Sequence, residues 1–158
     1  MLASDVGTRY QLSGVHDIGV ENLKRLGLAT ELSNAYPEKI AALWDLAISA
    51  HAPAHVGEHL PNFGVPGEDL VHLNIAATDE DFRRLSIAET LGYVDRVREM
   101  PRVKRIVVHN GDRQRLDNTP VAGQQGDYGL MIDSIRQIAD GAAEWGLEIV
   151  VENLPVYW

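Results

Sequence analysis

The chain has 158 residues, of which 45% are hydrophobic and 23% charged, a composition typical of one globular domain rather than of disordered or fibrous proteins. It contains no cysteine, which excludes disulfide scaffolds, thiol catalysis and thiolate metal sites. Its formal net charge of −9 disfavours a broad nucleic-acid interface, because an acidic surface repels phosphate backbones.

The first half of the chain alternates short apolar strands with helical segments. A strand is predicted over residues 28–34, and Pro37 then suits the first turn of a helix over residues 38–46. The next strand covers residues 47–51, and a weaker strand pattern lies near residues 1–8.

The second half repeats this alternation with longer helices. A helix is predicted over residues 79–100 and is followed by a strand over residues 105–109. A second helix covers residues 128–145, and a last strand covers residues 147–152. The strands are short, continuous apolar runs, which is typical of a parallel sheet covered by helices. The fold class is therefore α/β with βαβ units.

Both long helices show a candidate buried stripe. Thr78 and Asp81 resemble a capping box at the start of the first helix. Its apolar positions recur every three residues, at Phe82, Leu85, Ala88, Leu91, Val94 and Val97. The stripe of the second helix comprises Leu130, Ile132, Ile135, Ile138, Ala142 and Trp145.

Three of the predicted strands end on a polar side chain that can bind a metal. These residues are His51, His109 and Glu152. Because parallel strands end at the same edge of a sheet, the three side chains are expected to share a site, as in the active sites of (β/α)₈ barrels. Imidazole nitrogens and a carboxylate oxygen are donors that zinc, manganese, iron or cobalt accept. A single histidine at a strand end is more often structural, but three equivalent positions favour a common site.

Four short motifs resemble one family. They are Ser-Ala-His-Ala-Pro at 49–53, Leu-Asn-Ile-Ala at 73–76, Val-Val-His-Asn-Gly at 107–111 and Val-Glu-Asn-Leu-Pro at 151–155. In this order they resemble the xylose-isomerase-like TIM-barrel superfamily, which holds sugar-phosphate isomerases and epimerases and the endonuclease IV type of apurinic-site nucleases. The match spans residues 28–158.

The resemblance implies a metal site and its ligands. His51 and His109 fall on metal-ligand positions of the endonuclease branch. Glu152 falls on a ligand position shared with the epimerase branch, where it also acts in proton transfer, so Glu152 is the expected catalytic residue. The implied cofactor is a divalent metal, namely zinc, manganese, magnesium or cobalt, and the implied substrate is sugar-like.

Three further residues are candidates for substrate binding. Asn74 falls on an Asn-Leu-Ala motif of the family. Glu31 ends a strand on the expected active rim, where it could bind a substrate hydroxyl or serve a structural hydrogen bond. Arg113 follows the third strand of this pattern and could hold a phosphate, since guanidinium matches phosphate bidentately, or lie on the solvated surface.

The chain departs from the family pattern in three ways. Asn110 replaces the usual proline, and an insertion over residues 54–71 separates the first two motifs. Histidines in or beside this insertion, His55, His59 and His72, could form a lid but are expected to be solvent-exposed. A complete barrel takes ~250 residues, so we expect one TIM-barrel-type domain over residues 1–158, incomplete after the fifth strand, with about five of the eight βα units.

Three functions remain open. The first is a metal-dependent sugar or sugar-phosphate isomerase or epimerase that works by metal-assisted proton transfer. The second is an endonuclease IV-like apurinic-site phosphodiesterase, against which the acidic charge argues. The third is an incomplete, non-catalytic barrel that acts as a binding or assembly module.

The sequence also bears on partners and location. No apolar run reaches the ~18 to 20 residues that a bilayer span needs, so no membrane partner is expected. An open arc of strands would leave an edge and an apolar face uncovered, which invites association of copies into a homo-oligomer. The absence of cysteine and of a secretory pattern is consistent with a cytoplasmic protein.

Overall fold

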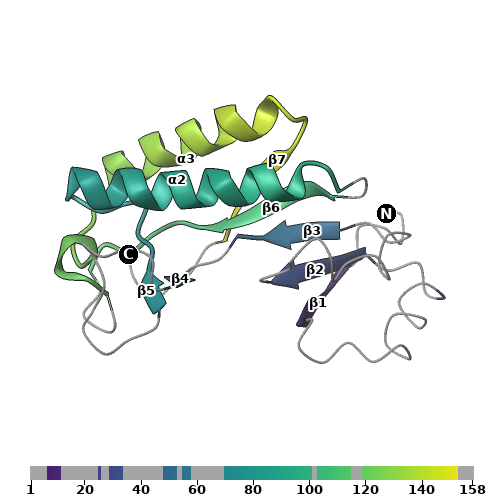
Figure 1. The fold of residues 1–158 in the computed structure, drawn as a ribbon, viewed down its shortest axis with the longest axis horizontal. Coiled ribbons are helices and arrows are strands. Elements are labelled where there is room, and N and C mark those ends of the chain that lie inside the picture. The colour runs from purple at the N-terminus through teal and green to yellow at the C-terminus, as the bar shows by residue number, and fades with distance from the viewer. Residues whose placement is uncertain are drawn as a thin grey trace.

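A computed structural model describes residues 7–11, 25, 29–33, 48–52, 55–57, 70–100, 103–114 and 119–152. Five strands form one sheet in the order β1-β2-β3-β6-β7, and every neighbouring pair is parallel. Their bounds are Gly7–Gln11, Ala29–Ser33, Ile48–His51, Val103–His109 and Glu148–Glu152. Helices α2 (Glu80–Val97) and α3 (Tyr128–Ala143) run side by side along one side of β6 and β7 (Figure 1). The α/β class with a parallel sheet is confirmed.

The core lies between these helices and the sheet. Ala50, Ile106 and Ile149 stand in register on β3, β6 and β7 and pack in one cluster with Val94 of α2 and Ala142 of α3. Because strand side chains alternate between faces, the neighbours of these three strand residues lie on the other face of the sheet. That alternation decides on which face the predicted ligands lie.

Helix α2 begins one residue later than the predicted capping box implies. Its N-cap is Asp79, whose carboxylate accepts a hydrogen bond from the backbone N–H of Phe82 at 2.9 Å. The hydroxyl of Thr78 instead donates to the carbonyl of Gln125 at 3.4 Å, so the predicted capping box is wrong.

The predicted stripe of α2 is only partly correct. A spacing of three residues drifts around a helix that has 3.6 residues per turn, so the buried face moves off the predicted positions. Ala88 is exposed, whereas the buried face consists of Phe82, Ser86, Ile87, Thr90, Tyr93, Val94 and Val97.

Helix α3 ends as predicted near Gly146, which adopts a left-handed φ of +67°. Trp145, however, is 50% exposed, so the prediction of a core tryptophan is wrong. It lies past the last helical turn, where the guanidinium of Arg98 stacks at 3.9 Å from the ring centroid.

The insertion between the first two motifs contains a second, smaller sheet. Strands β4 (His55–Gly57) and β5 (Leu70–His72) pair antiparallel, with His55 opposite His72. His72 is only 4% exposed, so the expectation that it is solvent-exposed is wrong.

Other expectations concern the N-terminal half and the membrane. The first strand lies at 7–11 rather than 1–8, whereas residues 1–6 and the predicted helix over 38–46 fall outside the described residues. Among the described helices, none has the length and apolar character that crossing a bilayer demands.

Candidate metal centre

The last residues of β3, β6 and β7 converge on one face of the sheet. His109 stands in register with Glu152, and His51 stands in register with Val107, two residues before His109 and therefore on the same face. The Nε2 atom of His51 lies 3.0 Å from Glu152 Oε2, and that of His109 lies 3.3 Å from the same oxygen. The two imidazole rings meet edge to face, with centroids 4.9 Å apart. The predicted convergence of the three side chains is confirmed.

The spacing between the Glu152 carboxylate and each imidazole fits a divalent metal. One ligand atom from each of His51, His109 and Glu152 lies within 4.8 Å of the others. In a tetrahedral zinc site with bonds of about 2.0–2.1 Å, two donor atoms lie about 3.3–3.4 Å apart. The separations of 3.0 and 3.3 Å between imidazole nitrogen and carboxylate oxygen are close to that value.

The hydrogen-bonding roles of the two ring nitrogens of His51 are also compatible with binding a metal ion. Its Nδ1 atom donates to the carbonyl of Ala52 at 2.9 Å, and its Nε2 atom faces the carboxylate of Glu152. A neutral imidazole carries only one N–H, so both contacts cannot be hydrogen bonds of the neutral ring. With the single proton of the neutral ring on Nδ1, Nε2 offers a lone pair on the side of Glu152, which is the form of imidazole that binds a metal.

Burial keeps His109 in the neutral form that binds metals. Desolvation is the largest cause that lowers the pKa of His109 to about 4, and the neighbouring His51 lowers it further. The carboxylate of Glu152 acts in the opposite direction and offsets part of this effect. Near neutral pH the ring therefore offers a lone pair without first losing a proton.

Two of the predicted substrate-binding residues, Glu31 and Arg113, lie on different elements. Glu31 lies in the middle of β2, in register with Ser49 of β3, so the expectation that it ends its strand is wrong. Arg113 is exposed on the segment after β6, where its carbonyl accepts a hydrogen bond from the N–H of Gly126. The roles of Glu31 and Arg113 in binding substrate stay predictions.

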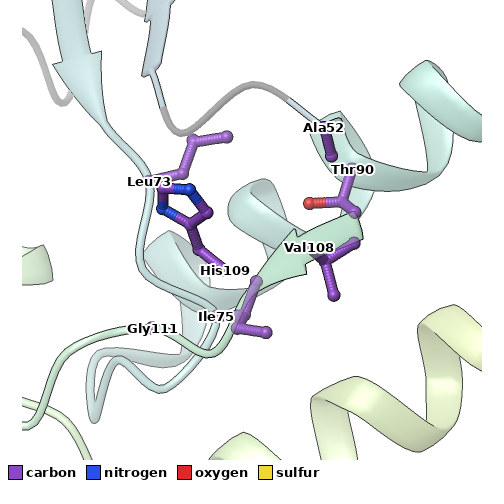
Figure 2. A pocket seen from close by; sticks show the side chains of 7 residues that line it. All are labelled: Ala52, Leu73, Ile75, Thr90, Val108, His109 and Gly111. Atoms are coloured by element: carbon purple, nitrogen blue, oxygen red, sulfur yellow. The ribbon is translucent and has the colours of Figure 1, made fainter. Parts of the chain in front are cut away.

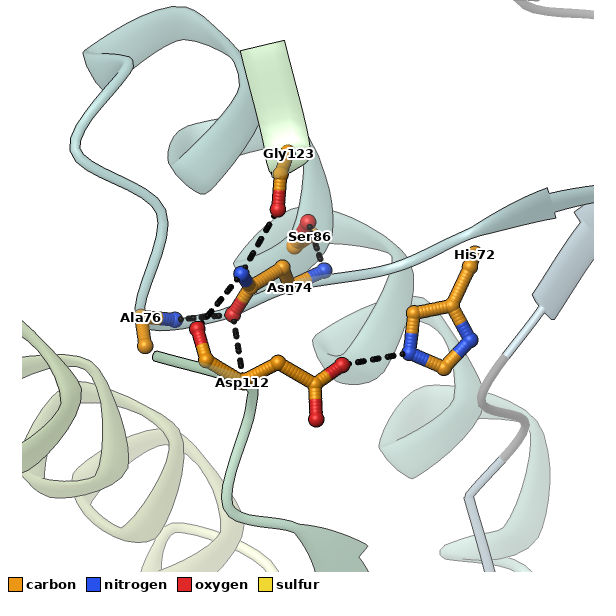
Figure 3. A network of polar contacts seen from close by, with 6 residues as sticks. All are labelled: His72, Asn74, Ala76, Ser86, Asp112 and Gly123. Carbon is orange, nitrogen blue, oxygen red and sulfur yellow. Dashed lines mark hydrogen bonds and ion pairs between the residues drawn. The ribbon is translucent and has the colours of Figure 1, made fainter. Parts of the chain in front are cut away.

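Asn74 is fully buried, and protein groups occupy its amide (Figure 3). Its Oδ1 atom accepts from the N–H groups of Ala76 and Asp112, and its Nδ2 atom donates to the carbonyls of Asp112 and Gly123. These contacts favour a structural role, because an amide has two donors and two acceptor sites and all are used. A contact between Asn74 and substrate stays a prediction.

Sequence reasoning missed a buried ionisable pair next to the candidate metal centre. His72 Nε2 lies 3.0 Å from Asp112 Oδ2, and the two side chains are 6% and 3% exposed (Figure 3). Forty positions separate the two residues, and no periodic pattern links them. The only sequence signal was the position of Asp112, three residues after His109 at a strand end.

A small cavity is lined on one side by His109 (Figure 2). It holds about 20 Å³, which is room for one water molecule. Its walls are mostly apolar and include Leu73, Ile75, Val108 and Thr90. The cavity is too small for a sugar, so it is not the place where a substrate would bind.

The parallel strands and the polar groups at their carboxyl ends define the class of fold, a partial (β/α) barrel with a candidate site at its functional end. The chain is similar to a xylose isomerase domain protein from Planctomyces limnophilus, with a TM-score of 0.59 and 14% sequence identity over 96% of this chain and 54% of that one. It is also similar to D-psicose 3-epimerase in the presence of D-fructose, with a TM-score of 0.60 and 18% identity over 94% of this chain and 52% of that one.

These similarities confirm the TIM-barrel type of fold that was predicted from the motifs. The chain spans about half the length of either protein, and its described parallel sheet has five strands. No family model and no curated protein matches the sequence.

Proposed function

We propose that the chain carries the metal centre of a sugar or sugar-phosphate isomerase or epimerase. The observation that supports this most directly is the meeting of His51, His109 and Glu152 at the carboxyl ends of three parallel strands. One of the similar structures is named as a sugar epimerase and another as a xylose isomerase domain protein, which agrees with a sugar-like substrate.

In this proposal, the two imidazoles and the carboxylate would hold a divalent metal, whose Lewis acidity would stabilise an oxyanion on the substrate. Glu152 also accepts a proton from the substrate carbon next to the carbonyl, and the C–H electron pair becomes the double bond of an enediolate. Return of the proton to the other carbon, together with transfer of the hydroxyl proton from one oxygen of the enediolate to the other, gives the isomer. Return of the proton to the opposite face of the same carbon gives the epimer. The lowered pKa of His109 keeps its ring neutral and available as a ligand.

The first test measures metal affinity. Zinc, manganese, cobalt and magnesium are titrated calorimetrically into metal-free chain and into its Glu152→Gln variant. Loss of a group that merely hydrogen-bonds to a ligand costs about 10–100-fold in affinity, and loss of the ligand Glu152 is expected to cost at least as much. Glu148→Gln is the matched control, because Glu148 lies in the same strand and its exposed carboxylate accepts a hydrogen bond from Arg105. Equal affinity in the two variants would contradict the proposed site.

The second test measures proton transfer. The chain is incubated with ketoses, aldoses and their phosphates in D₂O, and incorporation of deuterium next to the carbonyl is followed by NMR. Incorporation that needs metal and is lost in Glu152→Gln is the expected result. Cleavage of a duplex with an abasic site, without any deuterium incorporation, would instead support the endonuclease alternative.

A further inference from the structure

We propose that the buried pair of His72 and Asp112, held in place by Asn74, positions His109 as a metal donor. We name these three residues the rim clamp. The inference rests on the proposed metal centre and assigns positioning residues to it.

The two histidines of the centre are held by different means. The ring of His51 is oriented by its own neighbour, because Nδ1 donates to the Ala52 carbonyl at 2.9 Å. Among the described residues, His109 has no such bond to its second ring nitrogen, and its polar contact is with Glu152. The position of the His109 ring therefore depends on the backbone that carries it, namely the end of β6 and the residues just after it.

Asn74 fixes that backbone from the side. Asp112 N–H donates to Asn74 Oδ1 at 3.0 Å, and Asn74 Nδ2 donates to the Asp112 carbonyl at 2.9 Å. Between His109 and Asp112, Gly111 has a φ of +76° and lies so close to Asn74 that an added Cβ would be 2.7 Å from its Oδ1 atom. The strand end is thus closely packed against the segment that follows β5.

The His72–Asp112 pair adds a second tie at the same point. Its 3.0 Å contact joins the end of β5 to the segment after β6, and both side chains are almost fully buried (Figure 3). Burying an ionisable pair has a desolvation cost that an apolar pair of equal volume would avoid. The charges of both residues also act on the pKa of His109, which is consistent with a location close to that imidazole.

In metal sites generally, hydrogen-bond partners of the ligands hold those ligands in position. The His72–Asp112 pair can serve the same purpose for His109. It differs from the usual case because it acts on the backbone after His109 rather than on the ring itself. The small β4–β5 sheet then becomes a fixed support for the metal centre.

The test compares cobalt binding by the full chain and by variants of His72. Cobalt(II) is titrated into metal-free protein at 25 °C, and its visible absorption reports both affinity and ligand geometry. His72→Gln keeps a donor nitrogen near the position of Nε2, whereas His72→Asn is polar but too short to reach Asp112. The asparagine variant is expected to lose about 10–100-fold in affinity and to change the cobalt spectrum, and the glutamine variant to recover most of both.

Asp112→Ala tests the other half of the pair and should match His72→Asn. In the double variant the losses should not add, because the two residues act as one unit. Asp133→Ala is the control, since it removes the same charge from an exposed ion pair with Arg136 on α3. Thermal melting of each metal-free variant verifies that it is folded at the titration temperature.

The outcomes separate this inference from the proposed function. If the wild-type chain binds cobalt and His72→Asn binds it equally well with an unchanged spectrum, the clamp serves stability alone and the inference is overturned. If Asp112→Ala lowers the cobalt affinity but His72→Asn does not, the effect is that of a lost negative charge, and the inference is also overturned. A wild-type chain that binds no divalent metal would overturn the proposed function together with the inference.

Discussion

Buried polar side chains differ in how many of their possible hydrogen bonds the fold provides. The amide of Asn74 has partners for both donors and both acceptor sites, and it ties together the segments after β5 and β6 and residue Gly123. The hydroxyl of Tyr93 is the opposite case. It is buried in the core beside Val94 and Val97, and among the described residues its oxygen has no hydrogen-bond partner. Burial raises the pKa of Tyr93 to about 12, although the nearby charge of Arg96 acts to lower it.

Replacing Tyr93 with phenylalanine should therefore stabilise the protein. The change removes a hydroxyl whose burial without a partner costs about 1–3 kcal/mol and leaves the ring in place. We expect the free energy of unfolding to rise by roughly 1 kcal/mol, measured by urea denaturation. Tyr128→Phe is the control, because Tyr128 is 63% exposed and should change stability by less than about 0.5 kcal/mol. A clear loss of stability in Tyr93→Phe would show that the hydroxyl has a partner.

Among the strands, the longer ones could be predicted from the sequence and the three-residue strands could not. Strands β3, β6 and β7 were found because each is an apolar run closed by a glycine, a proline or a polar residue. Strands β4 and β5 have three residues each, too few to show a period. Their pairing depends on contacts across the insertion that no local pattern encodes.

Two glycines with a positive φ, Gly111 after β6 and Gly146 after α3, allow a comparative prediction. Gly111 and Gly146 both have a positive φ, so alanine is strained at either position by about 1–2 kcal/mol. At Gly146 an added Cβ meets no atom of the described part of the chain within 4 Å, whereas at Gly111 it would lie 2.7 Å from Asn74 Oδ1 and 2.9 Å from Ala76 N.

We therefore expect Gly111→Ala to lower the free energy of unfolding by clearly more than Gly146→Ala, measured by urea denaturation of both variants. The Gly146 variant isolates the backbone strain, and the excess in the Gly111 variant measures the close packing around Asn74. Equal losses would mean that the loop shifts to make room for the methyl group.

For the molecule as a whole, two simple rules sufficed to predict the candidate site. Parallel strands end at one edge, and their side chains alternate between faces, so His51, His109 and Glu152 had to meet if their strands were neighbours. The His72–Asp112 pair could not be predicted, because it depends on how the insertion packs against a loop 40 positions away. Local rules thus predict what a regular sheet brings together, but not what an irregular segment adds to it.

Because the site joins β3, β6 and β7, its protonation should affect the stability of the whole molecule. In the unfolded chain His109 takes up a proton below its ordinary pKa of about 6.5. In the folded chain desolvation and the charge of His51 lower that pKa to about 4, while Glu152 acts to raise it. Between these two values the unfolded state binds more protons, so stability must fall as the pH falls.

We expect the metal-free chain to lose up to about 3 kcal/mol of unfolding free energy through His109 between about pH 7 and pH 4, with little contribution from it above about pH 7.5. Urea denaturation in the presence of a chelator, repeated at intervals of half a pH unit, measures the slope. The His109→Gln variant should have a shallower slope over the same window, because its side chain does not titrate. Identical slopes would mean that His109 ionises in the folded protein as it does in the unfolded chain.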